Sequence, residues 1–176
     1  TVFIFGICLL FVYLLLAAQY ESLLLPFPVI LSLPAGIFGS YFFLQLAGLE
    51  NNIYAQVALV MLIGLLGKNA ILIVEMANQY RKQGMSIFDA AVRGSVSRLR
   101  PILMTSFAFI CGLIPLVMAS GAGALGNRSI GTAAAGAMFI GTFVGIFLVP
   151  GLYLIFESWS AHLNRNKVSY DEEDEK

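Results

Sequence analysis

Lys68 is the one charged residue in an apolar stretch that runs from Ile53 to Val74. A charged side chain near the middle of a bilayer costs about 2.5 to 3.5 kcal/mol on insertion scales, so it is seldom kept without a partner or a function. Glu75 follows seven residues later, about 10 Å nearer the membrane surface. No carboxylate of this chain is therefore expected at the depth of Lys68, and its anionic partner is expected on another segment. Lys68 indicates an ion pathway inside a membrane.

Two further polar residues are spaced so that they could work with Lys68. Arg98 and Thr105 are seven residues apart and share one face of a helix, with Thr105 about two turns deeper in the membrane. If this face meets the face of Lys68, the three side chains form a polar ladder that can carry protons from the inner surface to the bilayer centre. Other interpretations stay open: Arg98 also suits a basic anchor at a helix end, and the Thr105 hydroxyl also suits a bond within its own helix.

The composition places these residues in an integral membrane protein. Apolar residues make up 59% of the chain and charged residues 11%, and the mean hydropathy of +0.87 is outside the usual range of soluble domains. Cys8 and Cys111 lie in apolar runs without metal-site spacing, and His162 suits an interfacial position, so no disulfide, metal site or cofactor is predicted. No nucleophile with a base and no phosphate-binding loop is found, so neither an enzyme nor a nucleic-acid partner is predicted.

Five apolar segments are long enough to cross the membrane, which takes about 17 to 25 residues. They must be helices, because an unpaired backbone cannot be accommodated in lipid. We expect an all-α membrane protein with five transmembrane helices plus one short cytoplasmic interfacial helix. The expected transmembrane domain covers residues 1–160, with helices at about 2–19, 28–47, 53–80, 101–119 and 130–156. Residues 161–176 are expected to form a disordered, cytoplasmic acidic tail.

The connection between the third and fourth spans carries clear local signals. Gly84 can close the preceding helix in a left-handed conformation, and Ser86 to Asp89 is typical of a capping box. This box is expected to open the interfacial helix, which would end at about Val92. Gly94 is then expected to loosen the chain before Pro101, in the first turn of the next span.

Small residues recur at every fourth position of the last span, at Ala133, Ala137, Gly141 and Gly145. Such a ridge lets two helices approach closely in lipid. We expect it to pack within the bundle of this chain; a dimerisation face is the alternative.

The basic residues predict how the chain is oriented. Threading five helices through the membrane places Arg128 on one side and eight other basic residues on the opposite side: Arg81, Lys82, Arg93, Arg98, Arg100, Arg165, Lys167 and Lys176. The richer side is expected to be cytoplasmic, which puts the N-terminus of the chain outside. Because the first span begins without a start methionine or a basic signal-peptide region, a longer chain with preceding segments is expected.

Several blocks of residues occur together in a recognisable order: Gly67 to Glu75, Arg98 to Ser106, Pro115 to Val117 and Gly121 to Gly123, with Tyr20-Glu21-Ser22 and Pro26-Phe27-Pro28 before them. Together they resemble the C-terminal half of the resistance-nodulation-division multidrug efflux pumps, of the hydrophobe/amphiphile exporter type. The resemblance extends to about Phe156, and the five helices are similar to spans eight to twelve of that family. The connection between the third and fourth spans is slightly shorter than in the family pattern.

The resemblance implies a proton/drug antiporter of the bacterial inner membrane. Such pumps work as homotrimers with a periplasmic adaptor (membrane fusion) protein and an outer-membrane channel, and they take up amphiphilic small molecules. Lys68 matches the family's intramembrane lysine, which pairs with two aspartates on span four. Arg98 and Thr105 match the arginine and threonine of the proton relay.

Two other functions stay open. In a non-transporting membrane scaffold or assembly module, Lys68 would only hold two helices together. A metal or lipid exporter of the same superfamily is the other possibility, although the chain has no pairs of methionines at helical spacing around the relay.

Overall fold

The described part of the chain, residues 2–20 and 26–174 of a computed structural model, is made of five helices and contains no strand. In chain order the helices are α1 (Val2–Tyr20), α2 (Pro26–Leu46), α3 (Ile53–Lys82), α4 (Ile87–Val117) and α5 (Ala124–Asp174). Each contains a segment that is long and apolar enough to cross a membrane. The predicted all-α membrane fold with five membrane helices is confirmed. The Glu21-Ser22 part of the family pattern falls outside the described residues.

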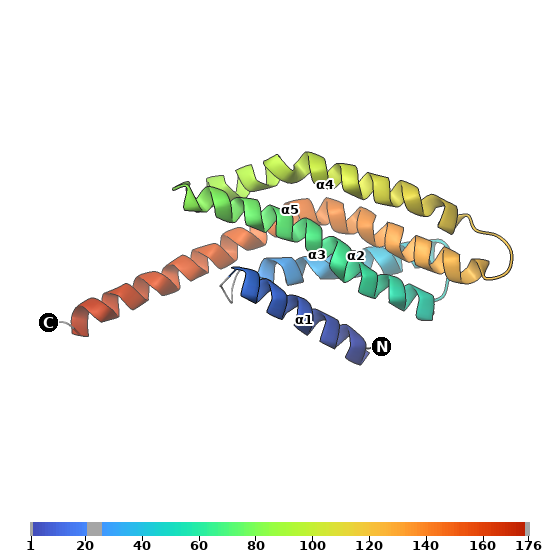
Figure 1. Cartoon of the computed structure of the whole chain (residues 1–176), viewed down its shortest axis with the longest axis horizontal. Helices are drawn as coiled ribbons and strands as arrows, with labels where there is room; N and C mark the ends of the chain where they lie inside the picture. The colour runs from blue at the N-terminus through green and yellow to red at the C-terminus, as the bar shows by residue number, and fades with distance from the viewer. Residues whose placement is uncertain (1, 21–25, 175–176) are drawn as a thin grey trace.

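Helix α5 is the centre of the bundle, because α2, α3 and α4 all pack against it. Helix α1 touches only α2 and α3, and Figure 1 shows it at one edge of the bundle. Many of its large apolar side chains are exposed, among them Phe3 and Phe11. Such a surface requires lipid or further protein around it.

The ridge of small residues on α5 packs inside the bundle, as expected. Ala133 and Ala137 are fully buried, and a Cβ atom added at Gly141 would lie 2.6 Å from Leu66 of α3. At Gly136 on the same helix, an added Cβ would lie 2.9 Å from the carbonyl oxygen of Gly39 in α2. The absence of side chains at these glycines lets α5 approach its neighbours closely, which is how helices associate in lipid.

The two turns next to the connection between α3 and α4 follow the predicted signals. Gly84 has a φ of 90°, and its N–H donates a hydrogen bond to the carbonyl of Arg81. Ser86 is the N-cap of α4, and its side chain accepts a hydrogen bond of 3.2 Å from the Asp89 N–H. These features end one helix and start the next within four residues.

The structure differs from the expected separate interfacial helix, because α4 is continuous from Ile87 to Val117. Gly94 does not loosen the chain: an added Cβ there would lie 2.7 Å from the backbone nitrogen of Ala77, so glycine permits close packing of α4 on α3. The hydroxyls of Ser95 and Ser97 bond to carbonyls of their own helix at 2.8 and 3.0 Å.

Helix α5 is also longer than predicted at both ends. It begins at Ala124 instead of near residue 130, after a turn in which Gly121 and Gly123 have positive φ angles. It continues through Asp174, so the backbone of the acidic segment is helical where disorder was expected. In Figure 1 these last turns extend away from the bundle.

Candidate functional site

Lys68 lies midway along α3 with its side chain exposed. It lines a groove of about 390 Å³ between α1 and α3, together with side chains that include Val12, Gln19 and Ile71. Apart from Lys68, the described residues that line this groove are uncharged. The groove therefore offers the Lys68 ammonium no carboxylate from the described residues that line it.

Thr105 and Arg98 lie on α4, and the hydrogen bonds described below join them to residues other than Lys68. The exposed Thr105 donates from Oγ1 to the carbonyl of Ile102 at 3.0 Å, which is the bond within its own helix that the sequence left open. Arg98 is half-buried, and its guanidinium lies 3.3 Å from the sulfur of Met76 on α3. Its Nε is buried without a hydrogen-bond partner among the described residues.

The residues that directly follow Lys68 and Thr105 form a hydrogen bond across the contact between α3 and α4. Asn69 donates from Nδ2 to Oγ of Ser106 at 3.4 Å, and both side chains are buried. Ser106 Oγ lies 2.9 Å from Oγ1 of Thr142 on α5. Asn69, Ser106 and Thr142, which we call the polar node, thus connect three helices by hydrogen bonds inside the bundle.

The polar node gives the relative orientation of the predicted residues. Helices α3 and α4 are antiparallel, since Gly94 packs on Ala77 near their connection and Ser106 bonds to Asn69 further from it. Each residue is rotated by about 100° from the next around a helix axis. In an antiparallel pair, the residues that directly precede two facing residues project to the same side of the contact. Lys68 and Thr105 therefore lie at similar depth on one side of the α3–α4 contact.

Arg98 follows the same geometry. It precedes Thr105 by two helical turns and so lies on the same side of the contact, nearer to the α3–α4 connection. The structure thus gives the three residues a common side and the expected order of depth, but it does not bring their side chains into contact with one another.

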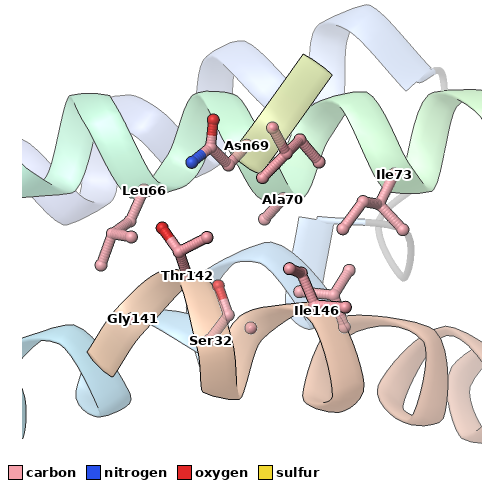
Figure 2. A pocket seen from close by; sticks show the side chains of 11 residues that line it. Ser32, Leu66, Asn69, Ala70, Ile73, Gly141, Thr142 and Ile146 are labelled. Carbon is pink, nitrogen blue, oxygen red and sulfur yellow. The ribbon is translucent and has the colours of Figure 1, made fainter. Parts of the chain in front are cut away.

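The sequence prediction missed the polar node. Asn69, Ser106 and Thr142 all interrupt apolar runs, and the first two adjoin Lys68 and Thr105. A search for every polar residue in the spans, not only for those that ionise, would have found them. Figure 2 shows Asn69 of α3, Thr142 of α5 and Ser32 of α2 around one small cavity of about 10 Å³. The Ser32 hydroxyl bonds to the Val29 carbonyl of its own helix.

Comparison with known proteins gives a single family. Residues 1–157 match the AcrB/AcrD/AcrF family. The chain is 48% identical over 155 residues to the toluene efflux pump membrane transporter TtgB of Pseudomonas putida (strain DOT-T1E), a match that covers 88% of this chain and 15% of that protein. It is 43% identical over 163 residues to the multidrug resistance protein MdtF of Escherichia coli (strain K12), covering 92% of this chain and 16% of MdtF. The chain thus spans about 15% of the length of the relatives that it matches.

Proposed function

The chain belongs to the AcrB/AcrD/AcrF family, and from this premise we propose that it forms five membrane helices of a drug/proton antiporter driven by the proton-motive force. The relatives described above include a toluene efflux pump membrane transporter and a multidrug resistance protein. Amphiphilic small molecules are accordingly the proposed substrates. Drug-binding regions and the acidic partner of Lys68 belong to the remainder of the protein.

In this proposal Lys68, Thr105 and Arg98 form the proton relay. When carboxylates of another helix are ionised, they hold the Lys68 ammonium by electrostatic attraction. Protonation of those carboxylates weakens the attraction, so Lys68 and its helix shift toward a second arrangement. Thr105 and Arg98 provide a hydroxyl and a positive charge along the route from the cytoplasmic surface.

The observation that carries the proposal is the exposed position of Lys68 halfway along a membrane helix, on the same side of the α3–α4 contact as Thr105 and Arg98. A lysine that only stabilised this bundle would have its partner within it. In the groove beside Lys68, which α1 and α3 line, the other described residues are uncharged. The proposal therefore places the acidic partner of Lys68 on a helix from the remainder of the protein.

The proposed pump is a homotrimer in the bacterial inner membrane, with the N-terminus of this chain periplasmic and its C-terminus cytoplasmic. It works with a periplasmic adaptor protein and an outer-membrane channel. Membership of the family supports these partners.

Replacing Lys68 by Met in the full-length protein tests the proposal. Met has a similar volume but no charge, so we expect drug efflux from intact cells to fall to the level of cells without the pump, while the amount of trimer is unchanged. Lys82→Met is the matched control, because Lys82 is an exposed lysine at the end of the same helix, and it is expected to leave efflux intact.

Full drug efflux by the Lys68→Met protein would overturn the relay. A scaffold predicts a different result: Lys68→Met would disrupt trimer assembly, and neutralising the acidic partner as well would restore it. If Lys68→Met abolishes export of metal ions or lipids while amphiphilic drugs are never exported by the wild type, the substrate class proposed here is wrong.

A further inference from the structure

The polar node is unusual for its surroundings, since hydrogen-bonding side chains from three helices meet in the apolar interior. Asn69, Ser106 and Thr142 are only 9%, 3% and 4% exposed. Apolar residues such as Leu66, Ala70 and Ile146 line the adjoining cavity (Figure 2). Within hydrocarbon no water competes for these bonds, so the three side chains depend on one another for hydrogen bonding.

Directional bonds of this kind restrict how the helices turn about their own axes. Contacts between apolar side chains are non-directional, and lipid on the outer side favours no particular face of an apolar helix. A rotation of α3 by one residue, about 100°, would remove Asn69 from Ser106 and bring Lys68 or Ala70 into the contact. The same rotation of α4 would replace Ser106 by Thr105 or Phe107.

We propose that Asn69, Ser106 and Thr142 are positioning residues, whose hydrogen bonds hold α3 and α4 at the rotation that presents Lys68 and Thr105 to the same side. The inference rests on the proposed function, because it assigns a role toward the relay. Thr142 extends the constraint to α5, against which α2, α3 and α4 all pack. The polar node therefore couples the orientation of the relay residues to the central helix of the bundle.

Two variants at Thr142 separate this role from simple packing. In the full-length pump, Thr142→Val removes the hydroxyl at nearly constant volume, whereas Thr142→Ser keeps the hydroxyl and removes only a methyl group. Ser106→Ala breaks the node at its centre. Ser40→Ala is the matched control, because Ser40 is fully buried in α2 and its hydroxyl has no hydrogen-bond partner in the described part of the chain.

We expect Thr142→Val to lower the rate of drug efflux per pump molecule about threefold, the factor that corresponds to about 0.6 kcal/mol for one hydrogen bond between membrane helices. The pH at which efflux is half-maximal should shift by about half a unit, since a displaced Lys68 interacts differently with its acidic partner. Ser106→Ala should have at least the same effect. Thr142→Ser and Ser40→Ala should retain the wild-type rate and pH midpoint.

Few charged groups lie near the relay, so a shift in the pH midpoint of efflux can be assigned to the interaction of Lys68 with its acidic partner. No other charged residue among those described lines the Lys68 groove, to which α1 contributes only uncharged residues. Glu75 on α3 and Arg98 on α4 lie about two turns away from Lys68 and Thr105. The contribution of Glu75 is tested with Glu75→Gln, which is expected to leave the effect of Thr142→Val unchanged.

Two results would overturn the inference. One is a Thr142→Val pump with the wild-type rate and pH midpoint. The other is a smaller amount of Thr142→Val pump in the membrane with unchanged activity per molecule, which would make the node purely structural. Lys68→Met measured in parallel separates the two proposals: if that variant exports drugs at the full rate, the relay itself is refuted, whatever the node variants do.

Discussion

Asn52 has two hydrogen-bonding functions at the start of α3. Its side-chain oxygen accepts a bond of 3.0 Å from the N–H of Ala55, which caps the helix. Its amide nitrogen donates at 2.9 Å to the buried hydroxyl of Ser129 on α5. One side chain therefore fixes where α3 begins and attaches that end to α5.

Substitution of Asn52 by Ala is expected to destabilise the full-length protein by about 1 to 2 kcal/mol, because a cap is lost and the Ser129 hydroxyl is left unpaired. Asn52→Asp keeps the capping oxygen and should recover part of this loss. The midpoint of unfolding by a denaturing detergent measures both effects.

The matched control is Asn51→Ala, since Asn51 is exposed and, among the described residues, its side chain makes only a bond of 3.4 Å to the Tyr41 hydroxyl. We expect its unfolding midpoint to equal that of the wild type. Equal midpoints for the Asn51 and Asn52 variants would contradict the role assigned to the cap.

At the scale of elements, the pairing of α2 with α5 depends on glycine on both sides. A Cβ added at Gly39 would lie 2.7 Å from the carbonyl oxygen of Gly136, and one added at Gly136 would meet Phe43 and the carbonyl of Gly39. Backbone atoms cannot move aside as the end of a flexible side chain can. The two helices would therefore have to separate to accept even a methyl group.

Gly136→Ala is expected to destabilise the protein by about 1 to 3 kcal/mol through overpacking. Gly145→Ala on the same helix has nothing within 4 Å of the added Cβ, and it should be neutral or stabilising by up to about 1 kcal/mol, because alanine favours the helix. Unfolding midpoints of the two variants should thus move in opposite directions or differ clearly; a common shift would refute the close approach of α2 and α5.

A second feature at this scale is that α4 is one continuous helix from Ile87 to Val117. The local sequence predicts that Gly94 loosens the chain before a new span begins near Pro101. Packing on α3 reverses this meaning for Gly94, because the short distance to Ala77 requires a residue without a side chain. Tertiary contacts therefore override the local preference, and α4 projects beyond the span that was predicted.

At the scale of the whole molecule, the two connections on either side of α4 lie at opposite ends of the bundle. Gln83 is exposed in the α3–α4 connection, and Ala122 is exposed in the α4–α5 connection. The distribution of basic residues predicts that the first is cytoplasmic and the second periplasmic.

Cysteine labelling tests this orientation. With Cys8, Cys111 and every other cysteine of the full-length protein replaced by Ala, a membrane-impermeant maleimide should label Ala122→Cys in cells whose outer membrane has been opened. Gln83→Cys should react only after the inner membrane has also been permeabilised. The reverse pattern would invert the topology and would place the acidic end of α5 outside the cytoplasm.

The number and approximate position of the membrane helices, the caps at Asn52 and Ser86 and the depth of Lys68 depend on local properties. A single sequence is enough to read these properties, which are the length of an apolar run, the order of residues at a turn and the rise per residue along a helix. For this reason the sequence alone predicts the five spans and the left-handed conformation of Gly84. The same local signal, a polar side chain just before an apolar run, also marks Asn52 as the cap of α3.

In contrast, the side of each helix that faces its neighbour depends on the tertiary structure. In water, apolar residues mark the buried face of a helix, but in a membrane both the interior and the lipid-facing surface are apolar, so this contrast is weak. Whether Lys68 or Asn69, and Thr105 or Ser106, enters the α3–α4 contact differs by one residue along the chain. The packing of three helices and the hydrogen bonds among Asn69, Ser106 and Thr142 determine which residue enters the contact. The reason is that polar groups from separate segments come within bonding distance only in the folded bundle.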